Sequence, residues 1–129
     1  MAGILSHHPC PCGSGHPFNT CCAPYLSGDT TPPTAEALMR SRYTAFTLQN
    51  TSYLNATWHP STRPANLELA DQAGTNWLGL TINRHEVIDA GHACVEFVAR
   101  YKLHGRAHRL HEISRFERVD GRWLYVDGE

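Results

Sequence analysis

Four cysteines gather near the start of the chain, and their spacing is the clearest chemical signal in the sequence. They are Cys10, Cys12, Cys21 and Cys22. Thiolate is the softest donor that a side chain offers, and a tetrahedral metal site needs four donors that converge on one point. Gly13 and Gly15 lie between the two pairs and allow the tight backbone reversal that would bring them together. The spacing therefore predicts a zinc site, which four thiolates would close and make structural rather than catalytic.

Two other uses of these cysteines stay open from the sequence. A disulfide framework would join Cys10 or Cys12 to Cys21 or Cys22, and a redox pair would use one thiol as a nucleophile. The chain contains no Cys-x-x-Cys sequence. Clustered cysteines in a reducing compartment hold metal more often than they form disulfides. Zinc is therefore the prediction, with the disulfide and redox uses as alternatives.

The same segment resembles the SEC-C motif, a small zinc-binding element found at the end of the secretion ATPase SecA and in many other proteins. The four cysteines fall on the ligand positions of that motif. The loop between them holds His16, Pro17, Phe18 and Asn19, where such motifs often carry lysines. The resemblance implies zinc as the cofactor and a protein partner that binds through this segment.

Composition excludes several classes of function. The 129 residues include 11 basic and 12 acidic side chains, so no positive field is available to attract nucleic acid. No apolar run approaches the length of a membrane span. The first nine residues lack a charged start followed by an apolar stretch, so a secretory signal is not expected. We therefore expect a cytoplasmic protein with neither a nucleic-acid partner nor a membrane segment.

A change in composition divides the chain into two parts. Residues 27–33 read Ser-Gly-Asp-Thr-Thr-Pro-Pro, which is typical of a linker. The prediction is a zinc-binding segment over 1–26, a linker over 27–33 and a main domain over 34–129. Because the first segment has almost no core of its own, we expect it to fold around its metal.

The main domain begins with helix signals. Thr34 and Asn50 are typical N-cap residues, so a helix is expected after each of them. Pro60 should stop the second helix after His59. One more helical turn or two is expected over residues 66–72.

The second half of the chain changes to the period of a β-strand. Strands are expected over 77–88, 94–103, 106–118 and 123–126, with a hairpin turn at Asp120-Gly121. Helices followed by an antiparallel meander predict an α+β fold. Long strands that cover helices should also curl.

Two charged residues fall on faces that these patterns bury. Arg42 lies on the apolar stripe of the first helix, and Glu112 shares its strand parity with Leu110, Ser114 and Phe116. A buried charge needs a partner, so one interpretation is an Arg42–Glu112 ion pair that holds the helix on the sheet. The other is the polar floor of a ligand pocket. The candidate pocket residues are Arg42, Tyr43, Trp58, His59, Tyr101, Glu112 and Ser114.

Long stretches of the whole chain also resemble the YchJ-type family of small bacterial proteins that carry a SEC-C motif. The similar stretches are 34–43, 57–64, 77–80, 95–101, 110–118 and 121–128. The resemblance implies that the main domain is NTF2-like. In such a fold, about three helices pack in the curl of an antiparallel sheet, forming a cone.

Two functions from different classes follow. The first is a zinc-binding adaptor whose cone domain binds a peptide or a small ligand. The second is a small-molecule enzyme of the isomerase, dehydratase or hydrolase type, which acts in the cone while zinc is only structural. His59 and Glu112 would then be the candidate acid and base, with tyrosines as donors.

Overall fold

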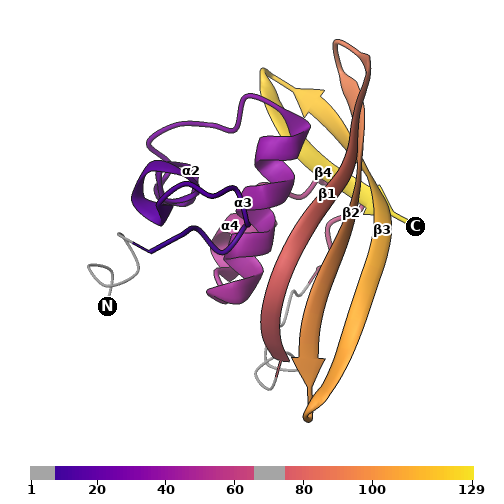
Figure 1. Cartoon of the computed structure of the whole chain (residues 1–129). Coiled ribbons are helices and arrows are strands. Elements are labelled where there is room, and N and C mark those ends of the chain that lie inside the picture. Colours follow the sequence, from indigo (N-terminus) through magenta and orange to yellow (C-terminus); the bar gives the residue numbers. More distant parts are fainter. Residues whose placement is uncertain (1–7, 66–74) are drawn as a thin grey trace.

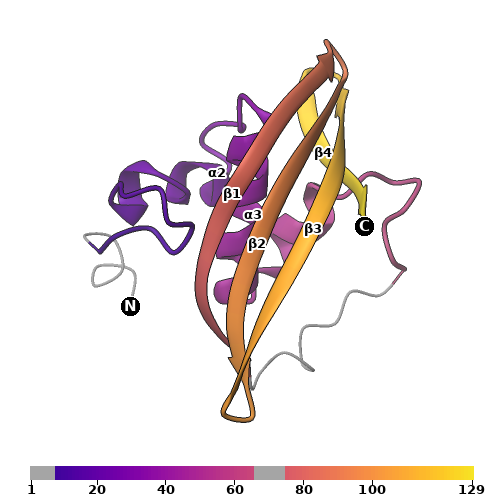
Figure 2. The same cartoon turned by 45° about the vertical axis from the view of Figure 1, so that its right-hand side comes forward.

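A curved antiparallel sheet carries the helices on its concave side in the computed structural model, which describes residues 8–65 and 75–129 (Figures 1 and 2). The elements are η1 (Phe18–Thr20), α2 (Ala23–Ser27), α3 (Ala35–Thr47), α4 (Thr51–Ala56), β1 (Thr75–Asp89), β2 (His92–Leu103), β3 (Arg106–Val119) and β4 (Arg122–Gly128). The α+β architecture predicted from the sequence is confirmed. Over the described residues, no helix has the length and apolar character needed to cross a membrane. The helical turn expected over 66–72 lies outside the described residues.

Both predicted helix N-caps are present. The Thr34 side chain accepts a hydrogen bond from the Ala37 backbone N–H at 3.0 Å, and α3 begins directly after it. The Asn50 side chain accepts one from the Tyr53 backbone N–H at 3.1 Å, and α4 follows. Each cap satisfies a backbone donor that the first turn of a helix leaves unpaired.

The second helix ends earlier than the sequence predicted. It stops at Ala56, three residues before His59. The Thr57 carbonyl accepts from the Tyr125 N–H at 2.8 Å, and the His59 N–H donates to the Tyr125 carbonyl at 2.7 Å. Residues 57–59 therefore pair with β4, because the edge strand offers backbone partners that a last helical turn would have left unused.

The strands form a simple meander in the order β1-β2-β3-β4, with antiparallel pairing throughout. Alternate residues of β2 face the helices and are almost fully buried; these are Ala93, Val95, Phe97 and Ala99. Phe97 lies opposite Glu112 of β3, and Ala99 lies opposite Leu110. This register brings the polar positions of β3 beside the apolar row of β2.

Helix α3 is buried on nearly all sides, because it lies between the sheet and the N-terminal segment (Figure 1). Its buried residues include small ones, such as Ser41, Thr44 and Ala45, which let other elements approach closely. Three of the four clustered cysteines, Cys10, Cys12 and Cys22, belong to the same core as α3. The N-terminal segment therefore shares its packing with the main domain.

Candidate functional site

The four N-terminal cysteines converge as a metal site requires. Their sulfur atoms all lie within 4.8 Å of one another. The Sγ atoms of Cys12 and Cys21 are 3.6 Å apart. A tetrahedral ion with metal–sulfur bonds of about 2.3 Å has sulfur–sulfur edges of about 3.8 Å. The donor set therefore fits a tetrahedral metal ion, and all five cysteines of the chain are free thiols.

The backbone of the loop brings the two pairs together. Gly13 and Gly15 have φ angles of 79° and 86°, a region in which a side chain would be strained. The Cys10 N–H donates to the His16 carbonyl at 2.8 Å, which closes the turn. Cys22 then stands at the N-terminal end of α2. The glycines named from the sequence thus have the role that was expected of them.

Hydroxyl groups from outside the cysteine motif contact the sulfurs. The Thr44 hydroxyl of α3 donates to Cys22 Sγ at 3.3 Å and lies 3.7 Å from Cys10 Sγ. The Ser14 hydroxyl lies 3.0 Å from Cys21 Sγ. Such contacts orient ligands and stabilise their charge. Sequence reasoning missed Thr44, because it considered only the apolar stripe of this helix.

The protonation of the four thiols depends on their neighbours. Hydrogen bonds from Cys10 and Cys22 hold the pKa of Cys12 well below its ordinary value. Burial raises the pKa of Cys21 to about 11. Contacts with Cys10 and Cys12, together with burial, raise the pKa of Cys22. Four thiols so close together cannot all ionise without added positive charge, which a bound divalent ion would supply.

A separate cavity of about 180 Å³ lies between α3 and the concave face of the sheet. Aromatic side chains form half of its wall, namely Tyr43, Phe46, Trp58, Trp77, Phe97 and Tyr125. The same wall also contains two charged residues, Arg42 and Glu112, and the hydroxyl of Ser114. A mostly apolar hollow with a few convergent polar groups is the usual form of a small-molecule site.

The structure brings together five of the seven pocket residues named from the sequence: Arg42, Tyr43, Trp58, Glu112 and Ser114. The other two, His59 and Tyr101, do not line the cavity. His59 Nδ1 lies 2.8 Å from the Ser61 hydroxyl, and its Nε2 lies 3.7 Å from a Glu117 oxygen. The Tyr101 ring stacks on His108 at a centroid distance of 5.1 Å. His59 and Glu112 therefore do not share this cavity.

Arg42 is the most deeply buried charge of the cavity, with 2% of its surface exposed. Its Nη1 donates to the Leu54 carbonyl at 3.0 Å and to the Thr57 hydroxyl at 2.7 Å. The guanidinium also lies over the rings of Trp58 and Tyr125, at 5.0 and 4.6 Å from their centroids. Burial lowers the pKa of Arg42 to about 10, so the group stays positive at neutral pH.

Glu112 enters the cavity from β3 but does not pair directly with Arg42. It accepts a hydrogen bond from the Ser114 hydroxyl at 2.6 Å. A Cβ on Gly128 would come within 2.2 Å of Glu112 Oε2, so a larger residue there would force the Glu112 side chain to move. Among the described residues, no ion pair within 4.0 Å includes Arg42 or Glu112. The predicted ion pair is wrong, because a helix carbonyl, a hydroxyl and two aromatic faces hold the guanidinium instead.

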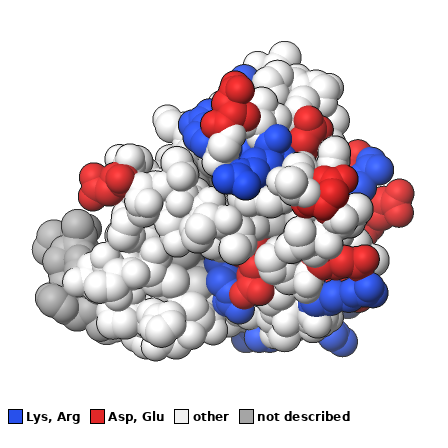
Figure 3. Space-filling view, turned by 90° about the horizontal axis from the view of Figure 1, so that it is seen from above, with Lys and Arg blue, Asp and Glu red and all other residues white. Residues whose placement is uncertain are grey.

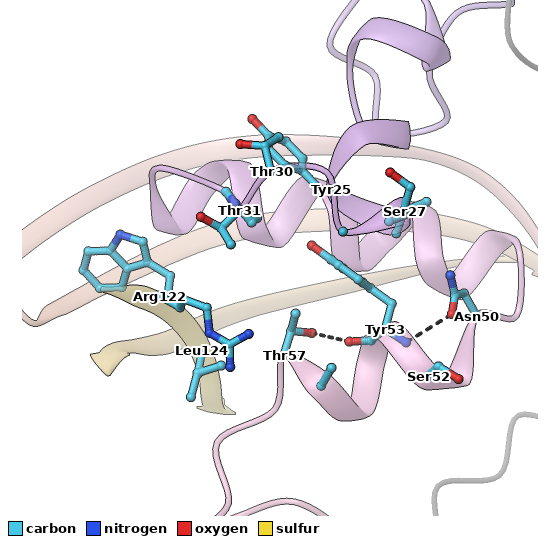
Figure 4. Close-up of a pocket in the computed structure, with 15 residues that line it drawn as sticks. Tyr25, Ser27, Thr30, Thr31, Asn50, Ser52, Tyr53, Thr57, Arg122 and Leu124 are labelled. Atoms are coloured by element: carbon cyan, nitrogen blue, oxygen red, sulfur yellow. Dashed lines mark hydrogen bonds between the residues drawn. The ribbon is translucent and has the colours of Figure 1, made fainter. Parts of the chain in front are cut away.

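A second hollow of about 340 Å³ lies between α2, α4 and the start of β4 (Figure 4). Hydroxyl groups from Thr30, Thr31 and Tyr53 are among its lining. The charged residue in its wall is Arg122, which is exposed to solvent. Because an exposed arginine is well hydrated, this hollow lacks the buried charge that distinguishes the cavity at Arg42.

Comparison with known proteins agrees with this architecture. Residues 34–128 match a family model described as the middle, NTF2-like domain of YchJ. The chain belongs to the YchJ family. It is 58% identical to the UPF0225 protein of Ralstonia nicotianae, over 93% of this chain and 90% of that one. It is also 58% identical to the UPF0225 protein of Cupriavidus metallidurans, over 94% of this chain and 88% of that one.

Two solved structures resemble this YchJ-family chain. One is the solution structure of a SEC-C motif containing protein from Rhodopseudomonas palustris, with a TM-score of 0.86 and 32% identity. The match covers 95% of this chain and 98% of that one. The other is a SEC-C motif containing protein from Psychrobacter arcticus, with a TM-score of 0.83, 28% identity and coverage of 96% and 83%. The NTF2-like fold and the SEC-C resemblance inferred from the sequence are thus confirmed.

Several cavity residues were missed by sequence reasoning. Tyr125 lies two residues after the buried Trp123 in β4, and no register shift separates the two, so strand alternation was the available signal for it. Met39 and Phe46 were seen on the same helical stripe as Arg42 but were assigned to the core. The i, i+3, i+7 spacing of that stripe was the available signal.

Proposed function

We propose that this YchJ-family protein binds zinc at its cysteine cluster as a structural centre and binds a small ligand in the cavity of its NTF2-like domain. The observation that supports ligand binding is the buried Arg42 at the wall of the aromatic cavity. Burying a guanidinium costs several kcal/mol even when it is well paired. A role in binding accounts for that cost.

Zinc is the metal that suits the cysteine cluster best. Four thiolates close enough to bind one ion tetrahedrally favour zinc or an iron–sulfur centre over magnesium, calcium or manganese, which prefer oxygen ligands. The protein supplies four sulfurs and hydroxyls from Ser14 and Thr44. A bound zinc ion would cross-link the N-terminal loop and the start of α2 beside α3. With four protein ligands it has no position for a substrate.

The size of the cavity sets the size of the ligand. Its volume of about 180 Å³ lies below the range of roughly 300–1,000 Å³ typical of drug-sized ligands. A compact molecule with one ring fits it better than a peptide. Its aromatic walls favour an apolar, flat body, while Arg42, Glu112 and Ser114 would orient the polar groups.

The enzymatic alternative has less support from this geometry. The acid and base expected from the sequence were His59 and Glu112, and only Glu112 lines the cavity. General acid–base catalysis needs both groups within reach of the same substrate. Binding therefore describes the cavity better than proton transfer between these two residues.

The test of ligand binding is protein-observed NMR with a library of small one-ring compounds. Binders should shift the indole N–H signals of Trp58 and Trp77, which both line the cavity. The variant Ala99→Leu should abolish these shifts, because Ala99 is 2% exposed and faces the same hollow. The control is Ala107→Leu, at an exposed position of β3. The proposal would be refuted if the compounds shifted the Trp58 and Trp77 signals equally in Ala99→Leu and in Ala107→Leu.

A protein partner for the N-terminal segment is a second proposal. Residues 8–34 contain no lysine or arginine and one acidic residue, Asp29. The corresponding lobe at the left of Figure 3 shows almost no coloured side chains. Charged residues are depleted in the centres of protein interfaces. A partner should be recovered from the native host by the wild-type protein and lost when the four cysteines become serine.

A further inference from the structure

We propose that the cavity ligand is a small, net-neutral molecule that carries a hydrogen-bond acceptor for Arg42 and a hydrogen-bond donor for Glu112. An amide or a related donor–acceptor group on an apolar ring has this chemistry. The inference rests on the ligand-binding function proposed above and names the class of ligand.

The acceptor half follows from the hydrogen bonds of Arg42. Both bonds that it makes within the described part of the chain come from Nη1. Its Nε and Nη2 donors have no acceptor among the described residues, although the side chain is 2% exposed and lines the cavity. A guanidinium offers five N–H donors. A ligand carbonyl at this wall would accept from donors that the protein leaves free.

The donor half follows from Glu112. The Ser114 hydroxyl donates to Oε2, and across the described residues no cationic side chain lies within 4.0 Å of the carboxylate. A carboxylate has about four lone-pair positions, of which Ser114 uses one. An N–H or O–H group on the ligand would therefore find an acceptor here.

Net neutrality follows from the presence of both charges in one hollow. Arg42 and Glu112 both line the same cavity of about 180 Å³, so a ligand that fills it lies close to both charges. An anionic ligand would meet the carboxylate, and a cationic ligand would meet the guanidinium. A neutral ligand with a donor and an acceptor is repelled by neither charge. The two charges together therefore select against anionic and cationic ligands.

Arg42 also determines which aromatic faces are available. Trp58 and Tyr125 already contact the guanidinium, so those faces do not form a cage for a ligand cation. Trp77 and Phe97 belong to the remaining wall. A flat ring packed against that wall would leave its polar substituent between the two charges.

The experiment compares benzamide, benzoate and benzylamine, which share one ring and differ in the charge of one substituent. Each is titrated into the full chain while the Trp58 and Trp77 indole signals are followed by NMR. We expect benzamide to bind at least about tenfold more tightly than either charged probe, since tenfold requires only about 1.4 kcal/mol. The variant Glu112→Gln should raise the affinity of benzoate relative to benzamide by about tenfold or more. The control Glu96→Gln should not, because Glu96 contacts His111 and does not line the cavity.

Each result decides the inference. Benzamide preference in the wild type, with the shift toward benzoate in Glu112→Gln, supports it. Equal or tighter binding of a charged probe at the cavity overturns it and leaves the ligand-binding function intact. Failure of all three probes to reach the cavity also overturns it, and the wider compound screen then decides the ligand-binding function separately.

Discussion

Replacement of Arg42 by methionine tests how this buried charge is held. The variant loses two hydrogen bonds from a charged donor, at 3.0 Å to the Leu54 carbonyl and at 2.7 Å to the Thr57 hydroxyl. Each such bond contributes about 1.5–3 kcal/mol, and a desolvated cation–π contact about 2 kcal/mol. Removing a buried cation also relieves a desolvation cost of several kcal/mol. We therefore expect the free energy of unfolding to fall by about 2–4 kcal/mol.

Glu112→Gln should behave differently, because Glu112 has no cation in direct contact. Glutamine keeps an oxygen that can accept from the Ser114 hydroxyl, so we expect a loss below about 1 kcal/mol. A direct ion pair would instead cost about 3–5 kcal/mol when one partner is removed. The two changes should be additive within about 1 kcal/mol in the double variant.

Urea denaturation followed by tryptophan fluorescence measures these differences, with an unchanged m-value as the test that unfolding remains comparable. The matched control is Arg84→Met, since the Arg84 side chain is 67% exposed and its pair with Glu86 lies on the surface. That variant should change stability by less than about 0.5 kcal/mol. A loss in Glu112→Gln as large as in Arg42→Met, or a coupling well above 1 kcal/mol, would show that the two side chains pair directly.

Three further predictions concern the metal, a glycine and a tyrosine. Chelation should release about one zinc ion per chain and lower the melting temperature of the whole protein, because the cysteines share its core; unchanged melting would contradict this. Gly13→Ala should destabilise more than Gly15→Ala in urea, by about 1 kcal/mol, since only at Gly13 does a Cβ meet the Leu80 carbonyl, at 3.0 Å. Burial raises the pKa of Tyr125 from 10.0 to about 12. Its contribution to the free energy of unfolding should therefore be complete below pH 10 and be lost as the pH rises toward 12. Tyr125→Phe should flatten that alkaline loss in denaturation curves, and an unchanged pH profile would count against the buried phenol.

The sequence alone determined the local chemistry of this protein. Cysteine spacing predicted that four thiols would converge, and they do, because residues close in sequence need only a short loop to meet. Thr34 and Asn50 located two helix starts, since a cap acts on backbone groups two or three residues away. Strand parity correctly placed Glu112 and Ser114 on the inner face of the sheet. Each of these results depends on interactions between neighbours in the chain.

Only the tertiary structure decided which distant groups meet. The end of α4 at Ala56 and the contact of Arg42 with Tyr125 both depend on β4, which lies far along the chain. The same is true of Thr44, which reaches the cysteine cluster because α3 packs between two other elements. Helical and strand periods show which face of an element is buried. They do not show which partner covers that face, because the partner is chosen by packing across the whole fold.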